Sequence, residues 1–350
     1  MGKNKKNKTN KTKVLPFVSL CTPTFNRRPF IPYMIKCFEH QTYPKDRIEW
    51  IIIDDGSDPI GDLVEHIPQV KYFYNTEKMV LGKKRNFMHS NCSGDIIVYM
   101  DDDDYYPPER ISHAVDMLVQ HPKFLIAGSS EMHMYFDSQK AVYQCGPYMN
   151  YHATAATFAF KKELLNQTSY DEENVFAEES KFTKSYTIPL IQLDTRKTIL
   201  VFSHSHNSLN KEKMLENPAQ TLIKPSRYTV DDFIKDPFLK QFYMYDMNIV
   251  LESYELGRRE HKPRLIEQLE KQEIERDRKM KEQIKKIEDQ HKLLELTNNI
   301  NVNSIDLNKM RVEYEKQLEN KNIIINELLK KVKVLTSKIS EYEQNITNKI

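Results

Sequence analysis

The sequence has few cysteines and no long apolar run. Its four cysteines show no CxxC or other paired spacing, which predicts reduced and mostly buried thiols. No stretch of 18 apolar residues occurs, and no apolar segment opens the chain, so we expect neither a membrane span nor a signal peptide. Together these absences predict a cytoplasmic protein.

The chain also lacks a strong excess of charge of either sign. Lysine and arginine number 52, aspartate and glutamate number 50, and the net charge is +2, so the total does not favour a nucleic-acid partner. The positive charge is unevenly spread, because the first thirteen residues carry six lysines and no acid. We predict that residues 1–14 form a disordered, solubilising basic tail.

Two common nucleotide-binding motifs are missing. No GxxxxGK[ST] occurs and no GxGxxG follows a predicted strand, which excludes a P-loop and disfavours a dinucleotide-binding Rossmann site. Short apolar runs nevertheless predict buried strands, at residues 15–21, 50–53, 70–74 and 95–100. Helical spacing predicts the helices between and after them, at residues 29–40, 82–90 and 109–120. Alternating strands and helices predict an α/β fold with a mixed, mostly parallel sheet.

Four consecutive carboxylates, Asp101–Asp104, follow the last of these strands. Their mutual repulsion raises their pKa values and costs stability, and a hard divalent cation relieves it through oxygen ligands. Ligands of open α/β sheets bind outside the carboxyl ends of the strands. With cations on the helix at residues 82–90, this edge suits a ligand that has a phosphate, a ribose and a metal. The alternative is a solvated acidic turn before the next helix.

Four segments, in order and spacing, resemble the nucleotide-sugar half of glycosyltransferase family 2, which has a GT-A fold. They are Thr22–Arg27, Trp50–Ser57, Gly82–Asn86 and Ser93–Pro108. The resemblance implies a nucleotide-sugar donor and a Mn²⁺ or Mg²⁺ ion. It places the DxD motif of the family on Asp101-Asp102-Asp103.

The resemblance also implies roles for single residues. Asp103 is the expected principal metal ligand with Asp101 beside it, and a late histidine, His206 in preference to His204, completes the metal shell. The expected donor contacts are Thr22, Asn26, Asp54, Asp55, Arg85, Asp101 and Asp102.

A pair of acids in the second half is the candidate catalytic base. Family members carry a Glu-Asp pair whose second acid takes a proton from the acceptor, and this chain has Glu178-Glu179. The second acid is thus longer by one methylene. We expect the base to be Glu179, with Glu178 as runner-up; two exposed helix acids are the alternative.

The composition changes after Arg258, where Lys, Glu and Gln dominate. Two series of residues spaced seven apart predict a parallel two-stranded coiled coil, and so a homodimer. They are Leu318, Ile325, Val332, Ile339 and Ile346, and Tyr314, Lys321, Leu328, Leu335 and Tyr342. An Asn-rich break at residues 297–308 precedes them. The alternative is a helix that folds back on the enzyme. We therefore predict a GT-A domain over residues 15–257, divided near residue 110 into a donor half and an acceptor half, and a helical extension over residues 258–350.

The expected function is a metal-dependent, inverting transfer of a sugar, with a UDP-sugar as the expected donor, to an acceptor hydroxyl of a glycan or protein. Two alternatives stay open. A sugar nucleotidyltransferase would release pyrophosphate, and a non-catalytic transferase-like head on a coiled-coil scaffold would not bind UDP with Mn²⁺. The Lys-, Asn- and Ile-rich composition resembles that of proteins from large DNA viruses or from other AT-rich genomes. For a viral protein, the cytoplasm is that of a host cell.

Overall fold

A computed structural model describes residues 14–173, 179–216, 222–297, 311–324, 326–327 and 330–331. The chain divides into two compact units, Met1–Glu273 and Ile274–Ile350, whereas the sequence analysis places the domain boundary at residue 257. The basic tail up to residue 13 and most of the predicted heptad series fall outside the described residues.

The first unit is built around a seven-stranded sheet of order β3-β2-β1-β4-β8-β5-β9. The strands are β1 (Val18–Thr24), β2 (Ile48–Asp54), β3 (Val70–Tyr74), β4 (Ile96–Tyr99), β5 (Ile126–Gly128), β8 (Ala159–Lys161) and β9 (Leu190–Gln192). Strand β8 runs antiparallel to both of its neighbours, and the other pairs are parallel. The predicted mixed, mostly parallel sheet is confirmed.

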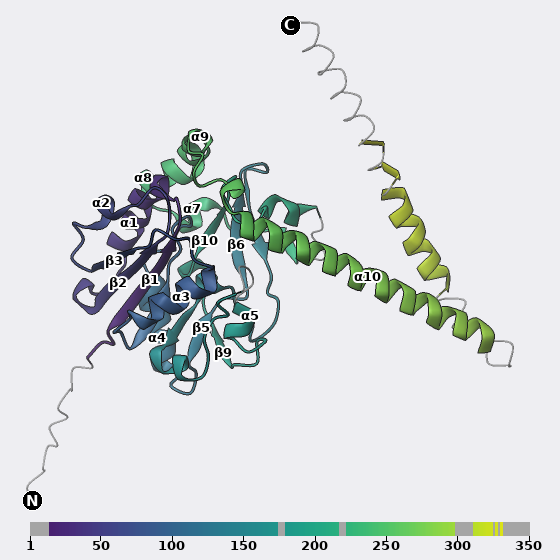
Figure 1. The fold of residues 1–350 in the computed structure, drawn as a ribbon, viewed down its shortest axis with the longest axis horizontal. Coiled ribbons are helices and arrows are strands. Elements are labelled where there is room, and N and C mark those ends of the chain that lie inside the picture. Colours follow the sequence, from purple (N-terminus) through teal and green to yellow (C-terminus); the bar gives the residue numbers. More distant parts are fainter. Residues whose placement is uncertain are drawn as a thin grey trace, which may run out of the picture. The chain divides into compact units, whose positions relative to one another are not determined.

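Strand register explains how helices cover both faces of this sheet. Leu20 pairs with Trp50 and Val98 across three strands, and all three are buried in one core with α1 (Ile31–Glu39) and α4 (Arg110–Gln120). The next residues along each strand point the other way, into a second core with α3 (Leu81–Ser90) and α5 (Glu179–Phe182). Figure 1 shows α1 and α3 on opposite sides of β1 and β2. The short helix α2 (Gly61–Val64) precedes β3.

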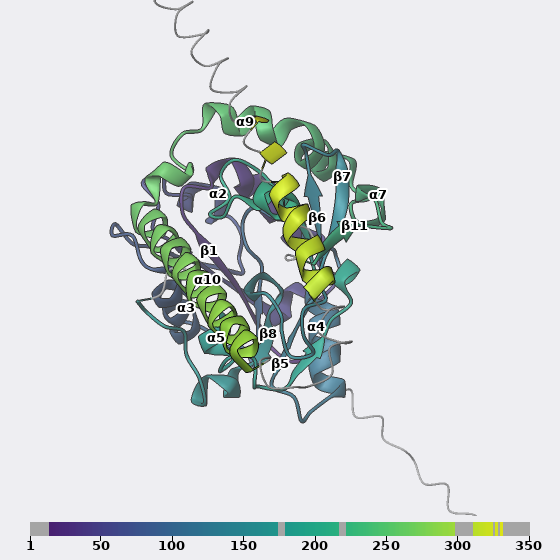
Figure 2. The same ribbon diagram turned by 90° about the vertical axis from the view of Figure 1, so that its right-hand side faces the viewer.

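A second, four-stranded sheet of order β10-β6-β7-β11 stands beside the first. Its strands are β6 (Met132–Phe136), β7 (Ala141–Cys145), β10 (Leu200–Ser203) and β11 (Ile223–Pro225), and Figure 2 shows β6, β7 and β11 next to α7 (Val230–Phe233). The apolar run at residues 124–134 predicts one strand, but it divides between β5 and β6 in two sheets. The strand predicted at residues 154–160 begins as a 3₁₀ turn, Ala155–Thr157.

Helical segments complete the first unit after β11. They are α7, α8 (Pro237–Gln241), a π-helical turn (Phe242–Asp246) and α9 (Met247–Ser253), and α10 (Pro263–Thr297) follows. The Phe242 ring stacks on Tyr33 with 3.4 Å between centroids, and the Tyr243 hydroxyl donates to the Asp104 carbonyl at 2.9 Å. These helices therefore hold the loop that carries the acidic run. None of the described helices combines the length and apolarity needed to cross a membrane.

Candidate active site

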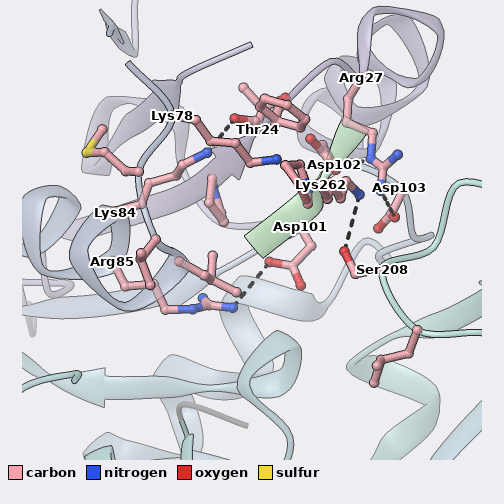
Figure 3. Close-up of a pocket in the computed structure, with 17 residues that line it drawn as sticks. Thr24, Arg27, Lys78, Lys84, Arg85, Asp101, Asp102, Asp103, Ser208 and Lys262 are labelled. Carbon is pink, nitrogen blue, oxygen red and sulfur yellow. Dashed lines mark hydrogen bonds and ion pairs between the residues drawn. The ribbon is translucent and has the colours of Figure 1, made fainter. Parts of the chain in front are cut away.

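A cavity of about 520 Å³ opens where β1 and β4 end. Its walls come from the loop after β1, the segment leading into α3, the acidic run after β4, and two later segments around Ser208 and Lys262. Figure 3 shows charged side chains of both signs facing this space. The volume falls in the range of small-molecule and cofactor pockets.

One wall carries the acidic run, and Arg27 neutralises part of it. The Arg27 guanidinium lies 3.5 Å from the Asp102 carboxylate and 3.1 Å from that of Asp103, and it donates to the His206 carbonyl at 3.0 Å. Asp104 points elsewhere, because its Oδ1 accepts the Phe202 backbone N–H at 3.0 Å. Three of the four acids therefore line the cavity, and the fourth anchors β10.

The pKa values of the two acids that contact Arg27 shift in opposite directions. Burial raises the pKa of Asp102 to about 7 against the opposing charge of Arg27. Burial also acts on Asp103, but Arg27 and a hydrogen bond from His204 bring the pKa of that carboxyl well below its usual range. In addition, Asp102 Oδ2 is buried and has no hydrogen-bond donor. The arrangement leaves room for one more positive charge beside Asp102.

The opposite wall is cationic and belongs to the start of α3. Lys84 donates to Asp55 Oδ1 at 2.5 Å and to the Thr24 carbonyl at 2.7 Å. Arg85 lies 4.0 Å from Asp101 Oδ1, and its guanidinium stands 4.5 Å from the centroid of the Tyr99 ring. Because each basic group has a fixed partner, the wall presents positive charge without side-chain freedom.

A glycine sets the position of this cationic helix. A Cβ atom on Gly82 would lie 1.8 Å from the Asp171 carbonyl oxygen, which no side chain permits. The close approach brings the first turn of α3 against residues 170–171, where Asn86 donates to the Tyr170 carbonyl at 3.0 Å.

Sequence reasoning placed four of the donor contacts at this cavity or next to it. Arg85, Asp101 and Asp102 line it, as does the predicted metal ligand Asp103, and Asp55 contacts two lining residues by accepting from Lys84 and from the Met79 backbone N–H at 2.6 Å.

Three expected donor contacts, Thr22, Asn26 and Asp54, do not line the cavity and take structural roles instead. Thr22 Oγ1 donates to the Met100 carbonyl at 2.7 Å and accepts from the Trp50 indole at 2.9 Å. Asp54 accepts the backbone N–H groups of Gly56 at 2.9 Å and Ile60 at 3.0 Å. The hydrogen bonds of both side chains therefore stabilise strands and turns.

Asn26 adopts a positive φ of 51°, and its side chain forms hydrogen bonds to two other segments. Its Oδ1 accepts the Asp58 backbone N–H at 3.1 Å, and its Nδ2 donates to the Leu256 carbonyl at 3.0 Å. The cavity wall next to β1 is formed instead by Pro23, Thr24 and Phe25.

Of the two late histidines, His204 rather than His206 contacts the acidic run. Its Nε2 lies 3.3 Å from Asp103 Oδ2, and burial lowers its pKa to about 4, so the ring is neutral. The His206 ring packs near Tyr254 with 6.2 Å between centroids. Strand β10 ends at Ser203, so both histidines lie beyond the strand. The geometry favours the runner-up.

The candidate catalytic acids lie on or near α5. Glu179 is the first residue of this helix and is partly exposed; its carbonyl accepts the Thr183 backbone N–H at 2.9 Å. It is not among the residues that line the cavity. Glu178, the runner-up, lies outside the described residues.

The carboxylates of the acidic run could supply some of the ligands of a divalent cation. Among the described residues no group of three or more His, Cys, Asp or Glu side chains is arranged to hold a metal ion. Mg²⁺ sites commonly use one or two carboxylates, and the remaining ligands are substrate phosphates and water. The unpaired oxygen of Asp102 and the neighbouring carboxylates Asp101 and Asp103 agree with that pattern.

Sequence reasoning missed four of the five basic residues that line the cavity: Arg27, Lys78, Lys84 and Lys262. Arg27 and Lys84 belong to segments that carry the family resemblance. In the structure they are buried, 6% and 4% exposed, and the sequence motif does not indicate this burial. Lys262 lies in a stretch with no motif at all, and nothing in the local pattern distinguishes it from the basic residues around it, Arg258, Arg259 and Arg264.

Comparison with known proteins adds a family match. The model of "Glycosyl transferase family 2" matches residues 19–217. A "GalNAc(5)-diNAcBac-PP-undecaprenol beta-1,3-glucosyltransferase" of Campylobacter jejuni is 33% identical over 113 residues, which cover 30% of this chain and 34% of that protein. An "Uncharacterized glycosyltransferase" of Haemophilus influenzae is 24% identical over 120 residues, which cover 33% of this chain and 47% of that one. This chain thus matches less than half the length of either relative.

Among solved structures, residues 1–349 of Staphylococcus aureus TarS in complex with UDP-GlcNAc have a TM-score of 0.45 and 19% identity, covering 71% of this chain and 78% of that one. A mannosyltransferase from Pyrobaculum calidifontis in complex with GDP-Man and Mn²⁺ has a TM-score of 0.45 and 17% identity, covering 69% and 71%.

Proposed function

The chain belongs to glycosyl transferase family 2, and we propose that it transfers a sugar from a nucleotide-sugar donor, a UDP-sugar in the first instance, to a hydroxyl group of a glycan or protein. The observation that carries the proposal is the cavity at the ends of β1 and β4, where the acids Asp101–Asp103 face the cations Lys84 and Arg85. A nucleoside diphosphate with a divalent ion has the complementary charges.

The protein's own groups would act first by positioning the donor. Lys84 and Arg85 are fixed by Asp55 and by the Tyr99 ring, so they would meet the donor without reorganising. Preorganised charge of this kind stabilises the negative charge that develops on a departing diphosphate. A Mn²⁺ or Mg²⁺ ion, held by Asp101 and Asp103 with His204 nearby, would add Lewis-acid stabilisation of the same charge when bound.

The acceptor step requires a base. We assign it to Glu179, with Glu178 as runner-up. The carboxylate takes the proton of the acceptor hydroxyl, the hydroxyl oxygen bonds to the anomeric carbon, and the bond from that carbon to the phosphate oxygen breaks. A single displacement of this kind inverts the anomeric configuration. The donor half over residues 15–110, the acceptor half over residues 111–257 and dimerisation through the C-terminal heptad belong to the same proposal.

A screen of nucleotide sugars with Mn²⁺ tests the reaction. The purified protein is incubated with each donor, with and without a mixture of simple glycan acceptors, and the released nucleotide is identified chromatographically. We expect a nucleoside diphosphate from at least one donor. Release of pyrophosphate would point to a nucleotidyltransferase, and release from no donor under any condition would contradict the proposal.

A further inference from the structure

The segment that follows α9 closes against the cavity, although it lies beyond the residues that the family model matches. Tyr254 donates to Asp58 at 2.9 Å, and the Leu256 carbonyl accepts from Asn26. A Cβ atom on Gly257 would lie 2.7 Å from the Asn26 carbonyl oxygen, so glycine permits this close approach. The segment is therefore joined to the loops after β1 and β2 by three separate contacts.

This attachment brings Lys262 into the wall of the cavity. The side chain is 7% exposed, and its ammonium group donates to Ser208 Oγ at 3.2 Å and to the His206 carbonyl at 3.5 Å. Figure 3 shows the ammonium group next to the acidic wall, with its hydrogen bond to Ser208. Lys262 is thus a buried basic group held by neutral oxygen atoms, and burial lowers its pKa to about 7.

Three of the other four cations that line the cavity have carboxylate partners, and the fourth, Lys78, donates to the His261 carbonyl at 3.3 Å. Arg27 contacts Asp102 and Asp103, and Lys84 contacts Asp55. Arg85 faces Asp101. Within the described part of the chain, no carboxylate forms an ion pair with Lys262. A buried charge that lacks a counter-ion is costly, and an anion entering the cavity would remove that cost.

The start of α10 adds to the positive potential at the same place. Pro263 is the first residue of this helix and also lines the cavity. Lys262 precedes it, and its carbonyl accepts the Ile266 backbone N–H at 3.1 Å. The N-terminal end of a helix carries partial positive charge and favours phosphate groups. A lysine and a helix N-terminus therefore face the cavity from one segment.

We propose that Lys262 binds a phosphate of the nucleotide donor, so that the segment around residues 254–263 is part of the donor site. The inference rests on the proposed function and goes beyond it, because it assigns donor binding to a segment outside the matched family region. The ligand is a diphosphate group, and Lys262 acts as a compact point charge toward it.

Calorimetric titration with UDP, GDP and inorganic pyrophosphate, each with Mg²⁺, tests the assignment. The variants are Lys262→Met, Lys262→Gln, which can still donate to Ser208, and Lys262→Arg. Lys123→Met removes an exposed lysine and controls for the loss of one charge. We expect Lys262→Met and Lys262→Gln to bind the preferred nucleoside diphosphate and pyrophosphate about 10- to 100-fold more weakly. Lys262→Arg should retain most of the affinity, and Lys123→Met all of it.

The outcomes separate this inference from the proposal on which it rests. Thermal unfolding without ligand should show both neutral variants folded, because they remove a charge that has no carboxylate partner. If the unaltered protein binds a nucleoside diphosphate and the folded neutral variants bind it within twofold as well, the role of Lys262 is contradicted while the proposed function stands. Binding of no diphosphate by the unaltered protein would contradict both.

Discussion

Large apolar side chains form a buried core in the first unit, whereas those of the second unit that the structure describes lie at the surface. Trp50 and Ile52 of the sheet have no exposed surface, because helices cover both faces. In the second unit Ile284 is 46% exposed and Leu318 is 49% exposed. Isoleucine and leucine that recur along polar helices are the pattern that a partner helix covers in a coiled coil. We infer that the first unit holds the chemistry and that the second serves association.

The largest effect should follow from removing the base in the first unit. If Glu179 takes the acceptor proton, Glu179→Gln should lower kcat by about 10²- to 10⁴-fold with little change in donor KM. Steady-state kinetics with the best donor and acceptor measure both constants. Glu178→Gln is the matched control, and a loss confined to that variant would move the base to the runner-up position.

Replacing Arg27 tests how much its buried ion pairs contribute to the stability of the first unit. Arg27→Met leaves Asp102 and Asp103 without their buried partner, so we expect a loss of about 3 kcal/mol in the free energy of unfolding. Arg28→Met removes ion pairs to Asp58 and Asp62 from a side chain that is 33% exposed and should cost less than about 1 kcal/mol. Urea unfolding compares the two, and equal losses would show that burial of the acidic wall is not important for stability.

The interior of the first unit should also respond to pH. His89 is buried against Tyr99, with 2.6 Å between Nε2 and the hydroxyl oxygen, and burial lowers its pKa to about 3. The unfolded chain binds a proton at His89 below about pH 6.5 and the folded chain does not, so stability falls as the pH falls toward 3. Between pH 6.5 and 5, His89 alone should contribute about 2 kcal/mol to this loss. Urea unfolding of His89→Gln should show a smaller loss over this interval; an unchanged profile would contradict the assignment.

The smallest effect on transfer should come from the second unit. Leu318→Asp places a charge in the predicted seam, so we expect sedimentation equilibrium to report the monomer mass where the unaltered protein reports a dimer. The rate of transfer should stay within twofold. A monomeric unaltered protein would contradict the coiled-coil prediction. A large loss of transfer in Leu318→Asp would contradict the inference that only the first unit holds the chemistry.

The same contrast explains which features the sequence could predict. Strands β1, β2 and β4 are continuous apolar runs that end in polar residues, so their order and the acidic edge followed directly. The run at residues 124–134 looked the same but crosses from one sheet to the other after Gly128, and a change of sheet leaves no periodic signal. The short strands β9 and β11 carry too few residues for a pattern.

The residues of the candidate site could likewise be predicted only where a local sequence pattern indicates them. Asp101–Asp103 and Arg85 were found because they stand at strand ends or in a motif, and the cavity brings them together. Thr22 and Asn26 belong to the same motif, yet their hydrogen bonds go to the backbone of distant segments, Met100 and Leu256. Lys262 reaches the cavity only because the preceding residues, Tyr254 and Leu256, contact Asp58 and Asn26. Residue type and spacing identify strand-end chemistry, whereas the contributions of later segments depend on tertiary packing.

The central claim is that the acids after β4 bind a cation and, through it, a diphosphate. Titration of UDP into the unaltered protein and into Asp103→Asn, each with Mn²⁺ and again with EDTA, tests it most directly. We predict that UDP binds the unaltered protein with Mn²⁺ at least tenfold more tightly than with EDTA, and that Asp103→Asn removes this difference. Equal UDP affinity in all four titrations would contradict the claim.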